Sequence, residues 1–176
     1  MKLKLHVPGL REMEHRQKWL AQPETMSYNR GQGIEADGYD PATGCIDFPI
    51  SDWRYWRDVW LFREPNRYSA YLLDEESGAF VGEVCYFYDM EADRHGAGVL
   101  IAHEHRGRGY GTEGLRLLVE RAFSRPEVES LFVDLPLERD RAVRMYLTNG
   151  FAEEQSGDGM VRLVLERKEG KEARKR

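Results

Sequence analysis

The chain has 176 residues, of which 41% are hydrophobic and 32% are charged, so it is long enough for one domain with a sizeable core. No apolar run approaches the roughly 18 residues that a membrane-spanning helix needs, and the first residues lack the apolar segment of a secretory signal. Two cysteines, Cys45 and Cys85, are too few for a disulfide framework or a cysteine-type zinc site. Composition therefore excludes a membrane-spanning, disulfide-stapled or disordered chain, and we expect a cytoplasmic protein.

The net charge is −5, and it is unevenly distributed along the chain. Residues 166–176 carry six basic and three acidic side chains, which leaves a net charge of −8 on residues 1–165. An acidic body does not suit the wide phosphate contacts of a nucleic-acid-binding protein, whereas it attracts cationic ligands. We expect a single domain over residues 1–167, a charged tail over residues 168–176, and neither a nucleic-acid nor a membrane partner.

The first third of the chain predicts one strand and two helices before the main sheet. Polar and apolar side chains alternate over residues 2–7, and the lysines on one face are typical of an edge strand. Apolar residues at helical spacing follow over residues 10–22. A tryptophan stripe, Trp53, Trp56 and Trp60, marks one face of a second helix, and we expect it to pack in the core.

The remaining two thirds alternate between strands and helices. The strand at residues 79–89 is apolar on both faces, so it is expected inside the sheet, and His95 is expected in the turn that follows it. The resulting order, β-α-α-β-β-β-α-β-α-β-β, predicts one α+β domain. Its further elements are strands at 67–73, 96–102 and 130–135, helices at about 111–125 and 138–149, and a hairpin that turns at 157–159.

A glycine-rich turn, Arg106-Gly-Arg-Gly-Tyr-Gly111, lies between a predicted strand and the helix that it opens. Glycines allow a tight turn that exposes successive backbone N–H groups. Those groups, the positive end of the helix dipole and the two arginines, Arg106 and Arg108, together predict an anion site of the kind that binds a pyrophosphate.

The same segment also matches the dinucleotide-binding fingerprint Gly-x-Gly-x-x-Gly at Gly109, Gly111 and Gly114, with Asp134 20 residues further on. In that fold the strand runs almost directly into the first glycine, whereas here residues 103–108 intervene. Because consecutive strands precede the turn, an NAD(P)-binding oxidoreductase is the less favoured alternative.

His103-Glu104-His105 contains two possible ligands for a metal-binding site. Metal sites normally need three or four converging ligands, and no third ligand is evident near these two histidines. We expect no metal.

Two motifs in register resemble signatures of the GCN5-related N-acetyltransferase (GNAT) superfamily. Arg106–Gly111 resembles the acetyl-CoA signature Arg/Gln-x-x-Gly-x-Gly/Ala, and Ala142–Phe151 resembles a second signature, a helix that ends in Tyr-x-x-x-Gly-Phe. The resemblance is strong over residues 79–155 and weak over the first 60 residues. It implies a mixed sheet of about seven strands flanked by about four helices, and transfer of an acetyl group from acetyl-CoA to a primary amine by direct attack.

The resemblance also implies the cofactor contacts. Acetyl-CoA would lie in an opening between strands 96–103 and 130–135, with its pantetheine arm held by backbone groups of Ile101 and His103. Arg139 stands where many members carry asparagine, and it is expected to meet a nucleotide phosphate instead. The pyrophosphate cradle would be formed by the N–H groups of Arg108, Gly109, Tyr110, Gly111 and Thr112.

Two residues are candidates for proton transfer. Tyr146 matches the tyrosine that protonates the departing CoA thiolate in many members. Glu83 lies mid-strand among apolar neighbours, where burial would raise its pKa and suit it to accept a proton from the amine. A structural carboxylate, paired with a buried arginine or facing water, remains the alternative for Glu83, and Glu104 is a competing base.

The acceptor amine, a small molecule or a peptide, is not identified by these residues. The segment 27–50 is rich in Gly, Asp, Asn and Pro and is expected to form a long loop on the acceptor side. Its acidic residues either hold an ammonium group or are simply solvated. These four acids are Glu35, Asp37, Asp40 and Asp47.

A non-catalytic acyl-CoA sensor is a further alternative, and the family resemblance is compatible with a homodimer.

Overall fold

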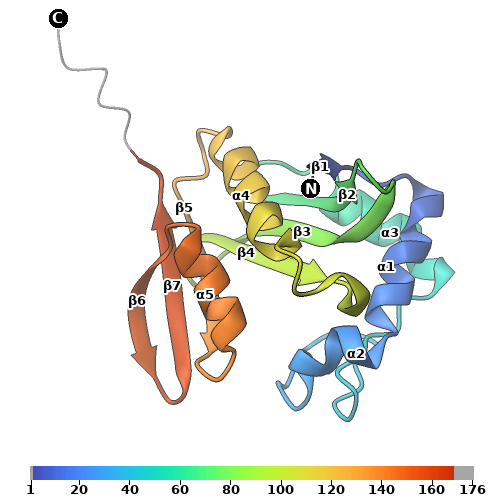
Figure 1. Cartoon of the computed structure of the whole chain (residues 1–176), viewed down its shortest axis with the longest axis horizontal. Helices are drawn as coiled ribbons and strands as arrows, with labels where there is room; N and C mark the ends of the chain where they lie inside the picture. The colour runs from blue at the N-terminus through green and yellow to red at the C-terminus, as the bar shows by residue number, and fades with distance from the viewer. Residues whose placement is uncertain (1, 169–176) are drawn as a thin grey trace, which may run out of the picture.

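The computed structural model describes residues 2–168, and the predicted tail beyond Lys168 lies outside the described residues. The described chain forms a seven-stranded sheet with helices on both faces (Figure 1). The strands are β1 Leu3–His6, β2 Arg67–Asp74, β3 Ala79–Asp89, β4 Arg94–Ile101, β5 Ser130–Pro136, β6 Ala152–Gly157 and β7 Met160–Glu166. The α-helices are α1 Met13–Leu20, α2 Pro23–Met26, α3 Ile50–Trp60, α4 Tyr110–Phe123 and α5 Asp140–Thr148, joined by 3-10 turns η1 Leu10–Glu12, η2 Ser27–Asn29 and η3 His103–His105.

The strand order is β1-β2-β3-β4-β5-β7-β6, and neighbouring strands are antiparallel except for β4 and β5. The predicted α+β class and mixed sheet are therefore confirmed. The prediction of an edge strand over residues 2–7 is also confirmed, because β2 is the one strand of the described chain that pairs with β1. Its Lys2 and Lys4 both lie 3.1 Å from Glu75, which follows β2.

One local prediction is right only in part, and another is wrong. The helix expected over residues 10–22 is present as α1 and ends before Pro23, but its first residues form η1, and Pro23 begins the additional helix α2. Proline is favoured in a first helical turn, because the N–H group that it lacks has no partner there. His95 lies inside β4 rather than in a turn, where its buried Nε2 is 2.9 Å from the carbonyl oxygen of Pro65.

The face of the sheet covered by α4 and α5 holds the larger hydrophobic cluster. Leu115, Leu118 and Ala122 of α4 are fully buried there. Gly114 brings the helix close to β2, because a Cβ atom at that position would stand 2.5 Å from a methyl group of Leu72. This close packing determines where the N-terminus of α4 lies relative to the sheet.

The opposite face is covered by α1, α3 and the long loop after η2. Trp53 and Trp56 pack against this second cluster, and Trp60 stacks on Trp56 at 6.0 Å between ring centroids. The prediction of core packing is therefore confirmed only in part, because all three rings are half-buried and Trp60 lies outside the cluster. The buried members of the cluster are Met13, Trp19, Leu20, Met26, Phe48, Leu61, Tyr71, Leu100 and Ala102.

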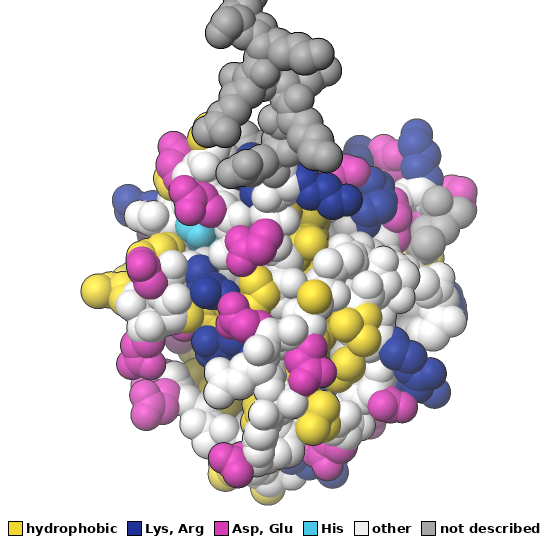
Figure 2. Space-filling view, turned by 90° about the vertical axis from the view of Figure 1, so that its left-hand side faces the viewer, with side chains coloured by type: hydrophobic (Ala, Val, Ile, Leu, Met, Phe, Trp, Pro, Cys, Tyr) yellow, Lys and Arg dark blue, Asp and Glu magenta, His cyan; other side chains and the backbone are white. Residues whose placement is uncertain are grey.

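The face around β6 and β7 carries interspersed acidic and basic side chains (Figure 2). Arg94 pairs with Glu154 at 2.8 Å, and Arg162 pairs with Asp134 at 2.6 Å. These exposed pairs neutralise one another locally, and each adds little to stability in water.

The packing of α4 can be tested by truncating one leucine. Leu118→Ala is expected to lower the free energy of unfolding by about 2–5 kcal/mol, because it leaves a cavity in a closed core. Leu147 on α5 is 45% exposed, and Leu147→Ala should change the same quantity by less than about 0.5 kcal/mol. Urea unfolding followed by circular dichroism measures both, and equal losses would contradict the placement of Leu118.

Candidate functional site

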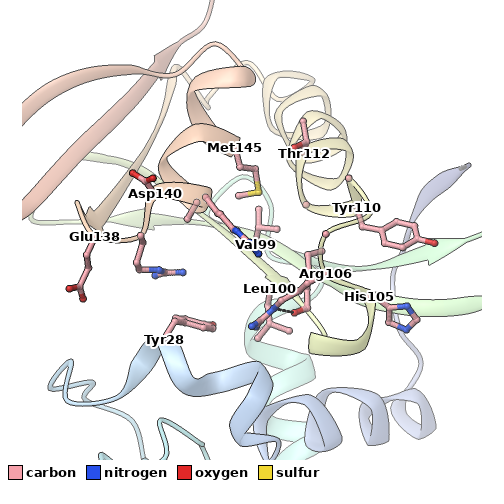
Figure 3. A pocket seen from close by; sticks show the side chains of 17 residues that line it. Tyr28, Val99, Leu100, His105, Arg106, Tyr110, Thr112, Glu138, Asp140 and Met145 are labelled. Atoms are coloured by element: carbon pink, nitrogen blue, oxygen red, sulfur yellow. Dashed lines mark hydrogen bonds between the residues drawn. The ribbon is translucent and has the colours of Figure 1, made fainter.

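The parallel strands β4 and β5 pair over only two positions, His95 with Leu131 and Gly96 with Phe132. Beyond this point the strands no longer pair, and a cleft of about 790 Å³ opens beside the unpaired part of β4 (Figure 3). Its walls come from the second half of β4, the glycine turn, and the first turns of α4 and α5, with Tyr28 of η2 on the opposite side.

The edge of β4 that faces the cleft is lined by backbone groups. The carbonyl oxygen of Ala97 accepts a hydrogen bond from Tyr146 at 3.3 Å, and that of Ile101 accepts one from Nε of Arg106 at 3.0 Å. Because backbone groups two residues apart point to the same edge of a strand, the N–H and C=O of Val99 face the same side. Val99 and Ile101 therefore both line the cleft, and Val99 is a residue that the sequence analysis missed.

The glycine turn directs the N-terminus of α4 at the cleft. Gly107 and Gly109 adopt positive φ angles of 76° and 85°, a conformation that favours glycine. The first amides of the helix have no acceptor within it, and no side chain among residues 2–168 caps them. Their partial positive charge makes this end of α4 suitable for an anion. These amides belong to Tyr110, Gly111 and Thr112, which all line the cleft.

Gly111 also sets the distance between α4 and α5. A Cβ atom there would stand 2.8 Å from Sδ of Met145, which lines the cleft from α5. Asn149 connects the same two helices, because its side-chain amide donates to the carbonyl oxygens of Thr112 and Met145 at 3.2 and 3.0 Å. The second sequence signature thus fixes the position of the N-terminal end of α4 against α5.

The polar side chains of the turn are largely engaged elsewhere. The guanidinium of Arg106 donates to the backbone carbonyls of Ile101, Glu24 and Thr25, so it connects the turn to α2. Arg108 is exposed and lies outside the cleft lining. The ring of Tyr110 points away from the cleft, and its hydroxyl donates to Asp74 at 3.0 Å (Figure 3). Backbone groups, rather than these side chains, present the donors.

His103 also differs from the expectation. It lies in η3, is exposed and does not line the cleft. Its backbone N–H donates to Oγ1 of Thr25 at 3.0 Å, so that group holds α2 against the end of β4.

Arg139 stands before α5 and faces Tyr28 across the cleft. Its guanidinium lies 4.5 Å from the ring centroid of Tyr28, and both residues line the cleft. Burial raises the pKa of Tyr28, and the charges of Arg139 and Glu83 both act on it. Tyr28 was not singled out from the sequence, although it begins the segment 27–50 that we expected on the acceptor side.

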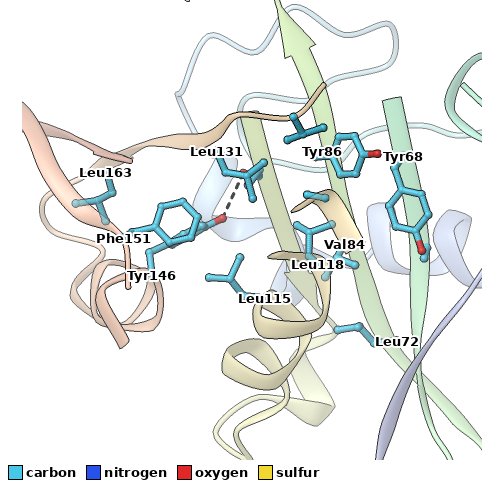
Figure 4. Packing of buried hydrophobic residues seen from close by; sticks show 14 of the residues in the cluster. Tyr68, Leu72, Val84, Tyr86, Leu115, Leu118, Leu131, Tyr146, Phe151 and Leu163 are labelled. Carbon is cyan, nitrogen blue, oxygen red and sulfur yellow. Dashed lines mark hydrogen bonds between the residues drawn. The ribbon is translucent and has the colours of Figure 1, made fainter. Parts of the chain in front are cut away.

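Tyr146 projects from α5 toward the point where β4 and β5 separate (Figure 4). Its side chain is 3% exposed and packs edge-on against Phe151, with 5.0 Å between ring centroids. Burial, with a contribution from the nearby Cys85, raises the pKa of Tyr146. The hydroxyl therefore keeps its proton at neutral pH.

Glu83 lies on the face of β3 that meets α1. Its Oε2 is 3.3 Å from Nε of Arg16, so the alternative of a carboxylate beside a buried arginine is realised in the structure. Burial raises the pKa of Glu83, and the positive charge of Arg16 opposes that rise. Glu83 pairs across the strands with Leu100, whose side chain lines the cleft.

The acidic residues of the long loop lie outside the cleft lining. Asp40 accepts hydrogen bonds from the backbone N–H of Ala42 at 2.9 Å and from the hydroxyl of Thr43 at 2.7 Å, so it stabilises a turn. Asp134, the acid of the dinucleotide alternative, is paired with Arg162 and also lies outside the cleft lining. Within residues 2–168 no three potential ligands come together in a way that would hold a metal ion.

Comparison with known proteins identifies the family. The chain matches the family model described as "Acetyltransferase (GNAT) family" over residues 36–151. Because the match covers more than half of the chain, this chain belongs to the GNAT acetyltransferase family, and the resemblance of its two motifs is confirmed. Curated protein sequences gave no match.

Solved structures confirm the fold. A spermidine N-acetyltransferase from Vibrio cholerae in complex with CoA and spermine superposes with a TM-score of 0.71 at 15% identity, covering 93% of this chain and 95% of that chain. An aminoglycoside acetyltransferase, AAC(6')-Ib, in complex with coenzyme A and kanamycin gives 0.67 at 18% identity, covering 94% and 95%. A GNAT-family acetyltransferase from Bacillus anthracis gives 0.69 at 10% identity, covering 94% and 95%.

The described helices are all too short or too polar to cross a membrane.

The anion site can be tested at its glycine turn. Gly109→Ala is expected to weaken acetyl-CoA binding by about tenfold or more, because a Cβ atom at positive φ strains the turn that aims the amides. Gly159→Ala provides a matched control, since Gly159 has φ +78° in open space on the β6–β7 hairpin. Calorimetric titration measures both variants. Equal weakening in the two variants, or none in Gly109→Ala, would contradict the assignment.

Proposed function

We propose that this chain transfers an acetyl group from acetyl-CoA to a primary amine by direct attack of the amine on the thioester. One observation carries the proposal: the uncapped N-terminus of α4 and the unpaired edge of β4 border the same cleft. The first suits the pyrophosphate of a CoA molecule, and the second suits the amide groups of its pantetheine arm.

The cofactor would be held mainly by backbone. The amides from Arg108 to Thr112 would cradle the pyrophosphate, and Val99 with Ile101 would pair with the pantetheine arm. Arg139 forms no ion pair within residues 2–168, so its guanidinium is available to a phosphate of the nucleotide. His103 and the side chain of Arg106 would shape the opening, since their polar groups already bind α2.

Acetyl transfer then needs two proton movements. The amine attacks only when neutral, and Glu83 would accept its proton directly or through water. Backbone N–H groups at the free edge of β4 would stabilise the negative charge on the carbonyl oxygen. As the C–S bond breaks, Tyr146 would give its proton to the thiolate and recover one from solvent. Burial raises the pKa of Tyr146, so the hydroxyl is protonated and available as the donor when the thiolate forms.

Two experiments in sequence test the function. Calorimetry is expected to give a Kd of about micromolar for acetyl-CoA and no signal for NAD. A screen of primary amines, followed by release of free thiol, is then expected to show turnover. Acetyl-CoA binding without turnover of any amine would favour the non-catalytic sensor, and binding of NAD instead of acetyl-CoA would favour the oxidoreductase.

Tyr146 has a direct test. Tyr146→Phe is expected to reduce turnover by about tenfold or more and to leave acetyl-CoA affinity nearly unchanged, because only the proton donor is lost. Tyr68→Phe is the control, since Tyr68 is a buried tyrosine of the same hydrophobic cluster. Unchanged turnover in Tyr146→Phe removes that hydroxyl from the mechanism.

Glu83 is tested by the pH dependence of kcat/KM. A base works only when ionised, so activity should fall as pH drops through the pKa of Glu83, which burial raises. Glu83→Gln is expected to lower activity and to abolish this acidic limb. Glu104→Gln, which alters an exposed carboxylate of η3, should leave the limb in place. An unaltered profile in Glu83→Gln would show that another group is the base.

A further inference from the structure

Arg16 of α1 is held in a fixed position beside Glu83. Its guanidinium carbon lies 4.3 Å from the ring centroid of Trp56 and 4.9 Å from that of Phe48. The two rings contact each other edge-on, with 76° between their planes, so Arg16 lies against both and its movement is restricted.

The contact between Arg16 and Glu83 involves only one atom of each side chain, and their other polar atoms have no hydrogen-bond partner within residues 2–168. Nε of Arg16 and Oε2 of Glu83 are 3.3 Å apart, buried, and without a hydrogen bond. Oε1 of Glu83 and the two Nη atoms of Arg16 have no partner within residues 2–168, and they are not among the buried unpaired atoms. Because the side chains retain exposures of 16% and 12%, these three atoms are the accessible part of the pair.

This pair lies next to the cofactor cleft. Glu83 is the cross-strand partner of Leu100, which lines the cleft, and its charge acts on Tyr28 at the opposite wall. Neither Arg16 nor Glu83 lines the cleft itself, and Leu100 is the residue that connects the pair to it.

We propose that Arg16 and Glu83 form the acceptor subsite and that the acceptor is an amine with a nearby carboxylate, as in an α- or β-amino acid. The two Nη atoms of Arg16 bind the carboxylate as a fork, and Oε1 of Glu83 takes the proton of the amine. This inference rests on the proposed acetyl transfer and names its substrate class.

The charge balance of the pair favours a zwitterion over a polycation. A carboxylate that served only to attract ammonium groups would be best left without a neighbouring cation, whereas here Arg16 neutralises Glu83. A polyamine has no carboxylate for Arg16, and its further ammonium groups would approach a like charge. The spermine named with the Vibrio cholerae structure is such a polycation. An amino acid instead presents one group of each sign to this pair.

The wild-type protein provides the first test. The common α-amino acids and β-alanine, each paired with its carboxamide, are assayed with acetyl-CoA by release of free thiol, with spermine in parallel. We expect kcat/KM for the best acid to exceed that for its carboxamide by about tenfold or more. The carboxamide carries the less basic amine, so a larger neutral fraction favours it chemically, and a preference for the acid must arise from recognition.

Variants of Arg16 provide the second test. Arg16→Met keeps a long side chain against the rings of Phe48 and Trp56. It is expected to raise KM for the acid by about tenfold or more and to leave KM for the carboxamide nearly unchanged. Arg16→Lys, which keeps the charge but lacks the fork, should fall between Met and wild type. Arg57→Met is the matched control, since Arg57 also lies over an aromatic ring, that of Phe62 at 5.3 Å.

The outcomes separate this inference from the proposed function. Thiol release with spermine or with carboxamides as efficient as with the acids would overturn the substrate class and leave acetyl transfer standing. Equal loss on acid and carboxamide in Arg16→Met would show that Arg16 only supports Glu83 or the fold. Acetyl-CoA binding without thiol release from any acceptor would contradict the proposed function itself.

Discussion

The separation of β4 and β5 after only two paired positions is the constraint on which the rest of the structure depends. A strand edge inside a domain has backbone groups that need partners. Tyr146 satisfies Ala97 at the start of the free edge, and Arg106 satisfies Ile101 at its end. The groups of Val99 between them face the cleft. Both protein partners come from segments that carry the family motifs, so the motifs shape the opening as well as border it.

The N-terminus of α4 and the Arg16–Glu83 pair carry different kinds of charge. On the cofactor side, helix α4 contributes partial positive charge from its backbone, which does not depend on the rotamer of any side chain. On the face of β3 that meets α1, Arg16 lies against the rings of Trp56 and Phe48 and beside the carboxyl group of Glu83. A buried pair without a hydrogen bond adds little stability by itself, because desolvation offsets the attraction. Its arrangement is better explained by a ligand that completes it.

Local features of the site could be predicted from the sequence, and long-range partners could not. The glycine turn, the start of α4 and the second signature depend on residues close together in the chain, and each was located correctly. Arg106 carries the same charge wherever it points, so nothing in the sequence revealed that carbonyls of α2, 81 and 82 residues away, would bind it. The acids of the long loop were candidates for holding an ammonium group on their charge alone, since the sequence does not show their partners. Asp40 is instead engaged in its own turn, and Arg16, an unremarked member of a helix, reaches Glu83.

The sequence by itself determined the α+β class, the internal position of β3, the edge position of β1 and the glycine turn that opens α4. Periodicity, glycine conformation and helix polarity act over a few residues, and they are therefore readable from the chain. Only the tertiary structure decided where β4 and β5 part and which side chains meet across the opening. Those outcomes depend on packing between segments far apart in sequence, such as Gly114 against Leu72 and Gly111 against Met145. The pairing of Arg16 with Glu83 across 67 positions of the chain is of the same kind, because it depends on the packing of α1 against β3.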